Sequence, residues 1–357
     1  MWQKLKIIDS SISDIIESYD CEDVSSNLNF NKLALDVFRF QYDYNNFYRN
    51  FCQNLGINKS KVEHYSQIPI ISTLSYKDGS IVSTLPKTIG GIEYVTSGTT
   101  NVIKGIIYRD PNFFILREKA ILAAGKNELF FRFYPDKIRI IFLDYPNRRN
   151  LNNYPLNYSV LYNFQRFFGN NNSICININF KDEMNNFIKI IRQHQQTKEP
   201  LVIMGPSYNI SFALDFFKRV DITDAYLPPK SIIMDSGGLK KQGYHTKYSE
   251  YVYDLLECFH ISRNDYINTY ALSEVGSQFS DNIRIFSENI WKQCPPWAKI
   301  RIINMENEKQ LECKTNEIGE VIIYDLLNRG SIFAIRTYDY AIKREKGFTI
   351  IERELLT

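Results

Sequence analysis

Short apolar runs alternate with amphipathic stretches through the middle of the chain, and this pattern predicts strands separated by helices. The apolar runs lie at residues 138–144, 173–178 and 201–204. Between the second and third runs, residues 184–195 repeat apolar positions at helical spacing. This alternation of strand and helix favours an α/β fold with largely parallel strands.

The two ends of the chain show different patterns. Residues 1–65 carry helical signals, and Asp9 with the two following serines is expected to cap a helix that runs through Ile12 and Ile16. After about Asn289 the pattern becomes short strands and turns. We therefore expect a helical N-terminal segment at 1–65, an α/β core at 66–288 and a β-rich subdomain at 289–357.

Composition and charge narrow the class of protein. The chain has 357 residues, of which 44% are hydrophobic, and its net charge is +3 with acids and bases mixed along it. We therefore expect one or two large domains, and neither nucleic acid nor membrane as a partner. Six cysteines and four histidines are scattered without metal-ligand spacing. This spacing favours a reduced, cytoplasmic protein without a structural zinc.

A loop rich in hydroxyl groups separates two strand-like runs at 92–95 and 104–108. Residues 96–101 supply four hydroxyls and a glycine, and Lys104 follows. Such a loop offers many donors to phosphate oxygens, and the lysine can neutralise part of their charge. The Gly-x-x-x-x-Gly-Lys-Ser/Thr nucleotide loop does not occur here. A plain polar turn between strands remains the alternative.

Three further candidate positions follow apolar strands. Met204-Gly205 precedes a helix that begins near Ser207 and contains Tyr208, and ligands collect at the carboxyl ends of strands in α/β sheets. Ser236-Gly237-Gly238 would let a backbone approach a flat ligand closely. A simple strand connection explains either position as well.

The third position combines an aromatic ring with a carboxylate four residues later. Tyr270 could stack on a base, and Glu274, which follows Ser273, could bind Mg²⁺ together with substrate phosphates. Taken alone, two such residues are more often ordinary surface residues.

Four motifs in this order resemble those of the adenylate-forming (ANL) superfamily, most closely its LuxE-like acyl-protein synthetases, with phenylacetate–CoA ligases as the other near branch. The family's hydroxyl-rich loop before Lys-Gly resembles residues 96–105, with Asn101 in place of a glycine. Its Tyr-Gly-x-Ser/Thr-Glu run resembles 270–274, with Ala271 in place of the glycine. Its Arg-Thr-Gly-Asp run resembles 336–339, with Tyr338 in place of the glycine, and Arg353 matches a later arginine.

The resemblance implies the ANL-type α/β fold, in which a large N-terminal domain with mixed or parallel sheets flanked by helices carries a β-rich C-terminal subdomain. It implies an enzyme, an AMP-producing acid–thiol ligase that uses ATP and Mg²⁺. A carboxylic acid would be activated as an acyl- or aryl-adenylate. The acyl group would then pass to a thiol of a carrier protein or partner protein, or of coenzyme A.

The resemblance also implies roles for single residues. Catalysis would rest on Lys104 and on Glu274, the metal ligand. Phosphate binding would use the hydroxyl-rich loop: Thr96, Ser97, Gly98, Thr99 and Thr100. Adenine and ribose binding would use six residues: Ser236, Gly237, Gly238, Tyr270, Asp339 and Arg353. The substrate pocket would be formed by Met204, Gly205, Tyr208 and Ser273.

Departures from the family leave alternatives open. Most of the superfamily continues into a small mobile C-terminal domain that bears a lysine, and we expect this domain to be absent after Thr357. Another polypeptide could supply that lysine, Lys104 and Mg²⁺ could suffice, or the chain could be a fragment. Cys294 and Cys313 are expected to be ordinary thiols. The alternatives are a catalytically degenerate subunit that binds nucleotide or acyl-adenylate, and an acyl-CoA ligase. The acid itself cannot be read from the sequence.

Overall fold

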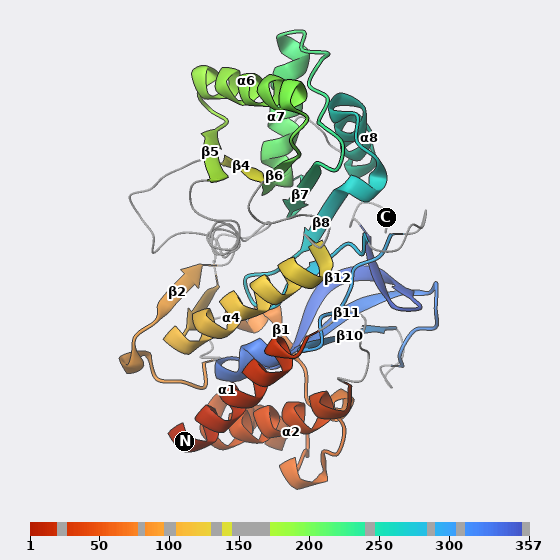
Figure 1. Ribbon diagram of the computed structural model, residues 1–357. Helices are drawn as coiled ribbons and strands as arrows, with labels where there is room; N and C mark the ends of the chain where they lie inside the picture. The colour runs from red at the N-terminus through yellow and green to blue at the C-terminus, as the bar shows by residue number, and fades with distance from the viewer. Residues whose placement is uncertain are drawn as a thin grey trace.

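The computed structural model forms two lobes, an upper one built from the middle of the chain and a lower one built from its two ends (Figure 1). It describes residues 1–19, 27–77, 83–95, 105–129, 138–144, 172–239, 247–283, 290–304 and 311–351. The upper lobe contains a mostly parallel sheet with helices packed against it. The lower lobe contains a mainly antiparallel sheet and the N-terminal helices.

The upper sheet has the strand order β5-β4-β6-β7-β8-β9 among the described residues. Its neighbours pair in parallel except for β8 and β9, which are antiparallel. The strands are β4 (Arg139–Asp144), β5 (Ser173–Asn177), β6 (Leu201–Pro206), β7 (Ile232–Ser236), β8 (Tyr266–Tyr270) and β9 (Phe279–Ser280). The predicted parallel α/β core is thus confirmed.

Alternation along each strand gives the upper sheet two apolar faces. In β4, Ile141 and Leu143 pack with the helices, whereas Ile140 and Phe142 join a smaller cluster with Ile121. The helices of the first face are α6 (Lys181–Thr197), α7 (Ser207–Arg219) and α8 (Tyr248–Phe259). Burial on both faces explains why these strands read as continuous apolar runs.

The lower sheet has the strand order β1-β12-β11-β10, with β13 paired to β12. Its strands are β1 (Ile71–Ser72), β10 (Ala298–Ile303), β11 (Ile318–Asp325), β12 (Ala334–Arg344) and β13 (Gly347–Ile351). A separate antiparallel pair consists of β2 (Ile92–Val95) and β3 (Ile106–Arg109). The helices are α1 (Trp2–Glu17), α2 (Asn27–Tyr44), α3 (Asn46–Asn54) and α4 (Pro111–Ala124). Short helical turns include η4 (Thr73–Tyr76), η6 (Gly125–Leu129), η10 (Arg263–Asp265) and η11 (Leu326–Gly330).

The N-terminal helices and the lower sheet share one hydrophobic core. Ile12 of α1 and Phe38 of α2 belong to the same buried cluster as Tyr324 of β11 and Ile335 of β12. Residues far apart in sequence therefore build this lobe together. The first helices and the last strands are packed as one body.

The expected helix cap at Asp9 is wrong. Helix α1 already begins at Trp2, so Asp9 lies inside it and not at its start. Its carboxylate is turned into the protein, where it accepts hydrogen bonds from Arg329 and Asn112. A buried partner from the other end of the chain thus outweighs the local capping preference.

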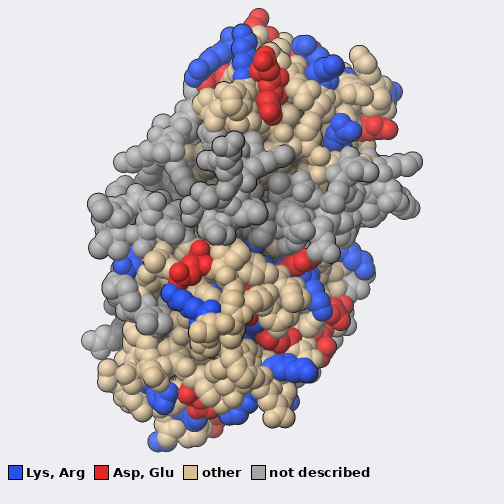
Figure 2. Space-filling view, turned by 90° about the vertical axis from the view of Figure 1, so that its left-hand side faces the viewer, with Lys and Arg blue, Asp and Glu red and all other residues tan. Residues whose placement is uncertain are grey.

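Charged side chains of both signs are interspersed over both lobes on the face that Figure 2 shows. In the part of the chain that the structure describes, none of the helices is long and apolar enough to cross a membrane.

Candidate functional site at the junction of the lobes

The carboxyl ends of the upper strands bring several predicted site residues to one edge of the sheet. In the register of β6 and β7, Gly205 lies beside Asp235, and Pro206 lies beside Ser236. Ser236 in turn lies beside Thr269, one residue before Tyr270. Because ligands collect at this edge of parallel sheets, the arrangement fits a binding site.

Gly205 is required by the close approach of β4. A Cβ atom at this position would lie 2.7 Å from the carbonyl oxygen of Leu143, so a larger residue would separate the strands. Met204 is buried in the cluster that also contains Phe142 and Met234. Tyr208 lies half-buried in the first turn of α7.

The loop after β7 is open and anchored at one point. Gly237 and Gly238 are exposed, and a Cβ atom at either would meet no heavy atom within 4 Å. Gly237 has a φ of 79°, which glycine adopts without strain. The Ser207 hydroxyl donates to the Gly237 carbonyl at 2.7 Å. This anchor fixes the loop, and among the described residues no heavy atom lies close to where a side chain at either glycine would begin.

Tyr270 connects the two lobes. It is the last residue of β8, and its hydroxyl donates to Oδ2 of Asp339 on β12 at 2.8 Å. Its ring packs against Phe279 and Phe348, with ring centroids 6.2 and 6.0 Å away. Burial raises the pKa of Tyr270 well above its usual value, and the carboxylate of Asp339 adds to the effect. The phenol therefore remains a donor.

Tyr338 occupies a backbone conformation that usually requires glycine. Its φ of 63° lies in the left-handed region, where a side chain is strained. Its hydroxyl accepts a hydrogen bond from Ser72 at 3.1 Å, and the Arg336 guanidinium lies 4.4 Å from the ring centroid. These contacts offset the strain. Ala271, by contrast, has no positive φ.

Glu274 lies four residues beyond Tyr270 and is 8% exposed. Burial raises the pKa of its carboxyl group. The charges of Arg109 and Lys77 oppose that rise, and the charge of Asp339 adds to it. Within the described residues, no side chain donates a hydrogen bond to its carboxylate. Glu274 is therefore a buried acid that is hydrogen-bonded to its own backbone N–H and has no side-chain donor in the described part of the chain.

A buried polar network holds the loop that carries Glu274. Arg109 at the end of β3 donates to the Ser273 carbonyl at 3.1 Å and to Oδ1 of Asn328 at 2.8 Å. Asn328 donates to the Glu274 carbonyl at 2.9 Å. Asp325 accepts hydrogen bonds from the backbone N–H groups of Gly276 and Ser277, both at 2.8 Å.

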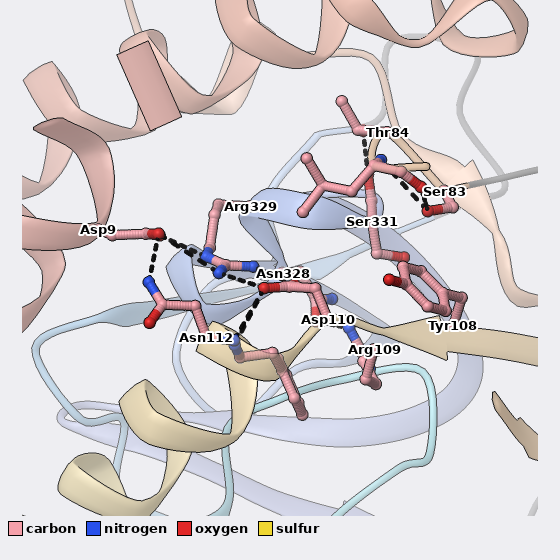
Figure 3. A network of polar contacts seen from close by, with 12 residues as sticks. Asp9, Ser83, Thr84, Tyr108, Arg109, Asp110, Asn112, Asn328, Arg329 and Ser331 are labelled. Atoms are coloured by element: carbon pink, nitrogen blue, oxygen red, sulfur yellow. Dashed lines mark hydrogen bonds and ion pairs between the residues drawn. The ribbon is translucent and has the colours of Figure 1, made fainter. Parts of the chain in front are cut away.

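The network extends to the N-terminal helix (Figure 3). Arg329 is fully buried and donates to Asp9 at 2.5 Å and to Asp110 at 2.6 and 2.8 Å. Asn112 donates to the other oxygen of Asp9 at 2.5 Å. Sequence reasoning missed this network, because its members come from four distant segments and share no local motif.

The structure brings some of the predicted site residues together. Tyr270, Ser273, Glu274 and Asp339 meet at the junction of the lobes. The loop after β7 belongs to the next strand of the sheet, and the residues at the end of β6 lie one strand further. The predicted phosphate loop with Lys104, and Arg353, lie outside the described residues. The flanking residues Val95 and Ile106 are paired.

A cavity of about 210 Å³ lies elsewhere, among α3, β1, η4, β11 and β12. It is lined by Phe47, Phe51, Ile70, Ile71, Ser72, Ser75, Ile322 and Arg336. None of the predicted site residues lines it.

Solved structures share the fold. An open form of 2-hydroxyisobutyryl-CoA ligase with 2-HIB-AMP and CoA aligns with a TM-score of 0.63 and 10% identity over 90% of this chain and 72% of that one. The same ligase in its postadenylation state with 2-HIB-AMP aligns with a TM-score of 0.63 and 10% identity, over 90% of this chain and 65% of its own length. Its complex with R3-HIB-AMP gives a TM-score of 0.61 and 10% identity over 94% and 70%. At this identity the likeness concerns the fold.

No curated protein sequence matches this chain. The family model described as "Acyl-protein synthetase, LuxE" matches residues 3–323, which include the three strands that carry the upper-sheet motifs, β6, β7 and β8, and most of the lower lobe. This match confirms the resemblance read from the motifs. The chain therefore belongs to the LuxE acyl-protein synthetase family and is an acid–thiol ligase, and it shares the fold of 2-hydroxyisobutyryl-CoA ligase.

Proposed function

We propose that this chain binds ATP at the junction of its lobes and uses it to activate a carboxylic acid for transfer to a protein thiol. A carboxylate oxygen of the acid bonds to the α-phosphorus, and pyrophosphate leaves. The thiol sulfur of a carrier protein or partner protein then bonds to the acyl carbon, and AMP leaves. The convergence of Tyr270, Glu274 and Asp339 in a member of this family is the observation that carries the proposal.

Asp339 is proposed to hold the ribose. A carboxylate has room for about four hydrogen bonds, and Tyr270 takes one of these places on Oδ2. Ribose hydroxyl groups are donors of the required kind. The open loop Ser236-Gly237-Gly238 is proposed to lie against the adenine together with Tyr270, and Arg353 to close on the nucleotide.

Glu274 is proposed as the ligand of Mg²⁺, and its environment fits that ion. Magnesium prefers one or two carboxylates together with phosphate oxygens, and the Glu274 carboxylate is buried without a side-chain donor in the described residues. When bound, the ion would neutralise phosphate charge. Lys104 and the hydroxyl-rich loop from Thr96 to Thr100 are proposed to bind the phosphates as well.

The acid is proposed to bind beside the end of β6. Met204 offers an apolar surface, Gly205 leaves the sheet edge free of a side chain, and Tyr208 and Ser273 supply hydroxyl groups near that edge. These residues are proposed to orient the acid's carboxylate toward the nucleotide. Catalysis of this kind depends on positioning more than on covalent chemistry.

Acid-dependent exchange of labelled pyrophosphate into ATP tests the proposal. The acids are straight-chain carboxylates of varied length together with benzoate and phenylacetate. At least one acid should support exchange that requires Mg²⁺. ATP binding in calorimetry without exchange from any acid would favour a catalytically degenerate binding subunit. Absence of both would overturn the proposal.

Variants locate the site. Asp339→Asn should raise the KM for ATP by about tenfold to a hundredfold, since a hydrogen bond to a charged group is worth about 1.5–3 kcal/mol. Glu274→Gln should lower exchange by about a hundredfold. Asp182→Asn, on an exposed residue in the first turn of α6, is the matched control and should change neither. Equal effects of all three would contradict the assignment.

A further inference from the structure

Arg109 is an unusual buried cation. It ends β3, is 2% exposed, and stacks on Phe113 with its guanidinium carbon 4.4 Å from the ring centroid. In the described part of the chain its hydrogen-bond acceptors are two neutral oxygens, Oδ1 of Asn328 and the carbonyl of Ser273. Its Nε–H has no acceptor there. A buried charge with neutral acceptors alone is expensive, so stability alone does not account for it.

Two acidic residues near Arg109, Asp110 and Asp325, already accept hydrogen bonds from other groups. Asp110 accepts two hydrogen bonds from Arg329 and further ones from backbone N–H groups of α4. Asp325 accepts from three backbone N–H groups and the Ser277 hydroxyl. The carboxylate that remains without a side-chain donor among the described residues is that of Glu274.

The contacts of Arg109 are made to the main chain on which Glu274 stands. The guanidinium binds the carbonyl of the preceding residue, Ser273, at 3.1 Å. It also binds Asn328, whose amide donates to the Glu274 carbonyl at 2.9 Å and whose oxygen accepts from the Gly276 N–H at 3.2 Å. Arg109 and Asn328 thus form hydrogen bonds with the backbone on both sides of Glu274.

We propose that Arg109 is a positioning residue: it fixes the Ser273–Glu274 main chain through Asn328 and so aims the Glu274 carboxylate at the Mg²⁺ of bound ATP. The inference rests on the proposed role of Glu274. Residues that orient a metal ligand typically contribute about tenfold to a hundredfold to metal affinity.

Arg117 provides a matched control in the same network. It is also buried, and its Nε–H donates to the Gly276 carbonyl at 3.1 Å. It therefore braces the same loop at Gly276, two residues beyond Glu274. A merely structural role would make the two arginines equivalent.

The experiment measures ATP affinity of the full chain by calorimetry in MgCl₂ and in EDTA, for Arg109→Gln, Arg109→Lys and Arg117→Gln. The ratio of the two affinities reports the contribution of Mg²⁺. Arg109→Gln should reduce this ratio by about tenfold or more and leave the affinity in EDTA unchanged. Arg109→Lys should fall between Arg109→Gln and the wild type, because an ammonium keeps the charge without the planar fork. Arg117→Gln should keep the wild-type ratio.

Thermal melts establish that each variant is folded, and Arg109→Lys decides the question if Arg109→Gln does not fold. A wild-type ratio in the folded Arg109 variants, or an equal loss in Arg117→Gln, would overturn the positioning role. The proposed function fails separately, if wild-type ATP affinity is absent or is insensitive to Mg²⁺, or if Glu274→Gln leaves the ratio unchanged.

Discussion

The cores of the two lobes are built on different principles. In the upper lobe, the buried surfaces between the sheet and α6–α8 consist mostly of Ile, Leu, Phe and Ala side chains that follow strand and helix periodicity. The buried carboxylate of Asp235 in β7 accepts its hydrogen bonds from the neutral groups of Tyr251, Tyr266 and Asn268. In the lower lobe, an apolar core of similar kind surrounds a buried group of charges: Asp9, Asp110, Arg109 and Arg329. The stability of the lower lobe thus depends on every member of this charged group being present.

This difference determines how much stability each core loses when one of its side chains is replaced. An apolar core loses stability in proportion to the volume removed, because its contacts are many and individually small. A buried ion-pair group loses much more when one member is removed than its net contribution to stability, because the remaining charge stays buried without a partner. The loop that carries Glu274 is fixed to this second kind of core.

The largest effect is expected for Arg329→Met. The change leaves the carboxylates of Asp9 and Asp110 buried without their cation, at a cost of about 3–5 kcal/mol in the free energy of unfolding. Urea denaturation measures it. Arg192→Met removes an exposed pair with Asp224 and should cost no more than about 1 kcal/mol. If both substitutions lowered the free energy of unfolding by similar amounts, the special dependence of the lower lobe on its buried charges would be contradicted.

Ile203→Ala tests the upper lobe and should cost about 2–4 kcal/mol through lost burial and the cavity that remains. The cost should not depend on salt concentration, because no charge is involved. Ile115→Ala on the exposed side of α4 is the control and should stay within about 0.5 kcal/mol of the wild type. A salt-dependent cost for Ile203→Ala would mean that the upper core is not purely apolar in its energetics.

Acid should act through the lower lobe. Burial alone would raise the pKa of Asp110, but the hydrogen bonds and charge of Arg329 outweigh it and hold that pKa below the usual value of 3.8. A carboxyl group whose pKa is lower in the folded state stabilises the protein above its unfolded pKa, and this stability is lost as the pH falls below about 4. Asp110→Asn should therefore be less stable at pH 7 and show a flatter decline below pH 4 in urea titrations. Parallel declines in the two proteins would exclude Asp110 as a source of acid sensitivity.

The smallest effect concerns Tyr338. Tyr338→Ala keeps the left-handed backbone strain and loses the contacts with Ser72 and Arg336, whereas Tyr338→Gly loses the contacts and the strain together. The glycine variant should therefore be more stable than the alanine variant by about 1 kcal/mol. Thermal and urea unfolding compare them directly. An alanine variant as stable as the glycine variant would show that the backbone relaxes at this position.

The parts of the fold that follow local periodicity could be predicted from the sequence. The apolar runs became β4, β5 and β6, and the amphipathic stretch became α6, because each pattern is set by which faces are buried. The Tyr270–Glu274 run lies within the residues that the family model matches, whereas Asp339 lies beyond them and was predicted from its resemblance to a family motif alone. Their meeting at the junction of the lobes agrees with that reading.

The buried polar network could not be predicted. Asp9 reads as a helix cap because its local sequence suits one, and only Arg329, 320 residues later, turns it into a buried partner. Arg109 likewise looks like an ordinary charged residue at the end of a strand until the Ser273 loop packs against it. Local patterns carry no information on such pairings, which are decided by tertiary contacts.

The long reach from Asp9 to Arg329 also has a consequence for the order in which this polypeptide can acquire its shape. The strands β4 to β9 lie between residues 139 and 280, so on the ribosome the upper lobe has all of its sheet partners while the lower lobe still awaits β10 to β13. The first helix must remain without its cation throughout this interval. The first segment to be synthesised is thus among the last to form its native contacts. It is also the segment most in need of protection from non-native contacts during synthesis.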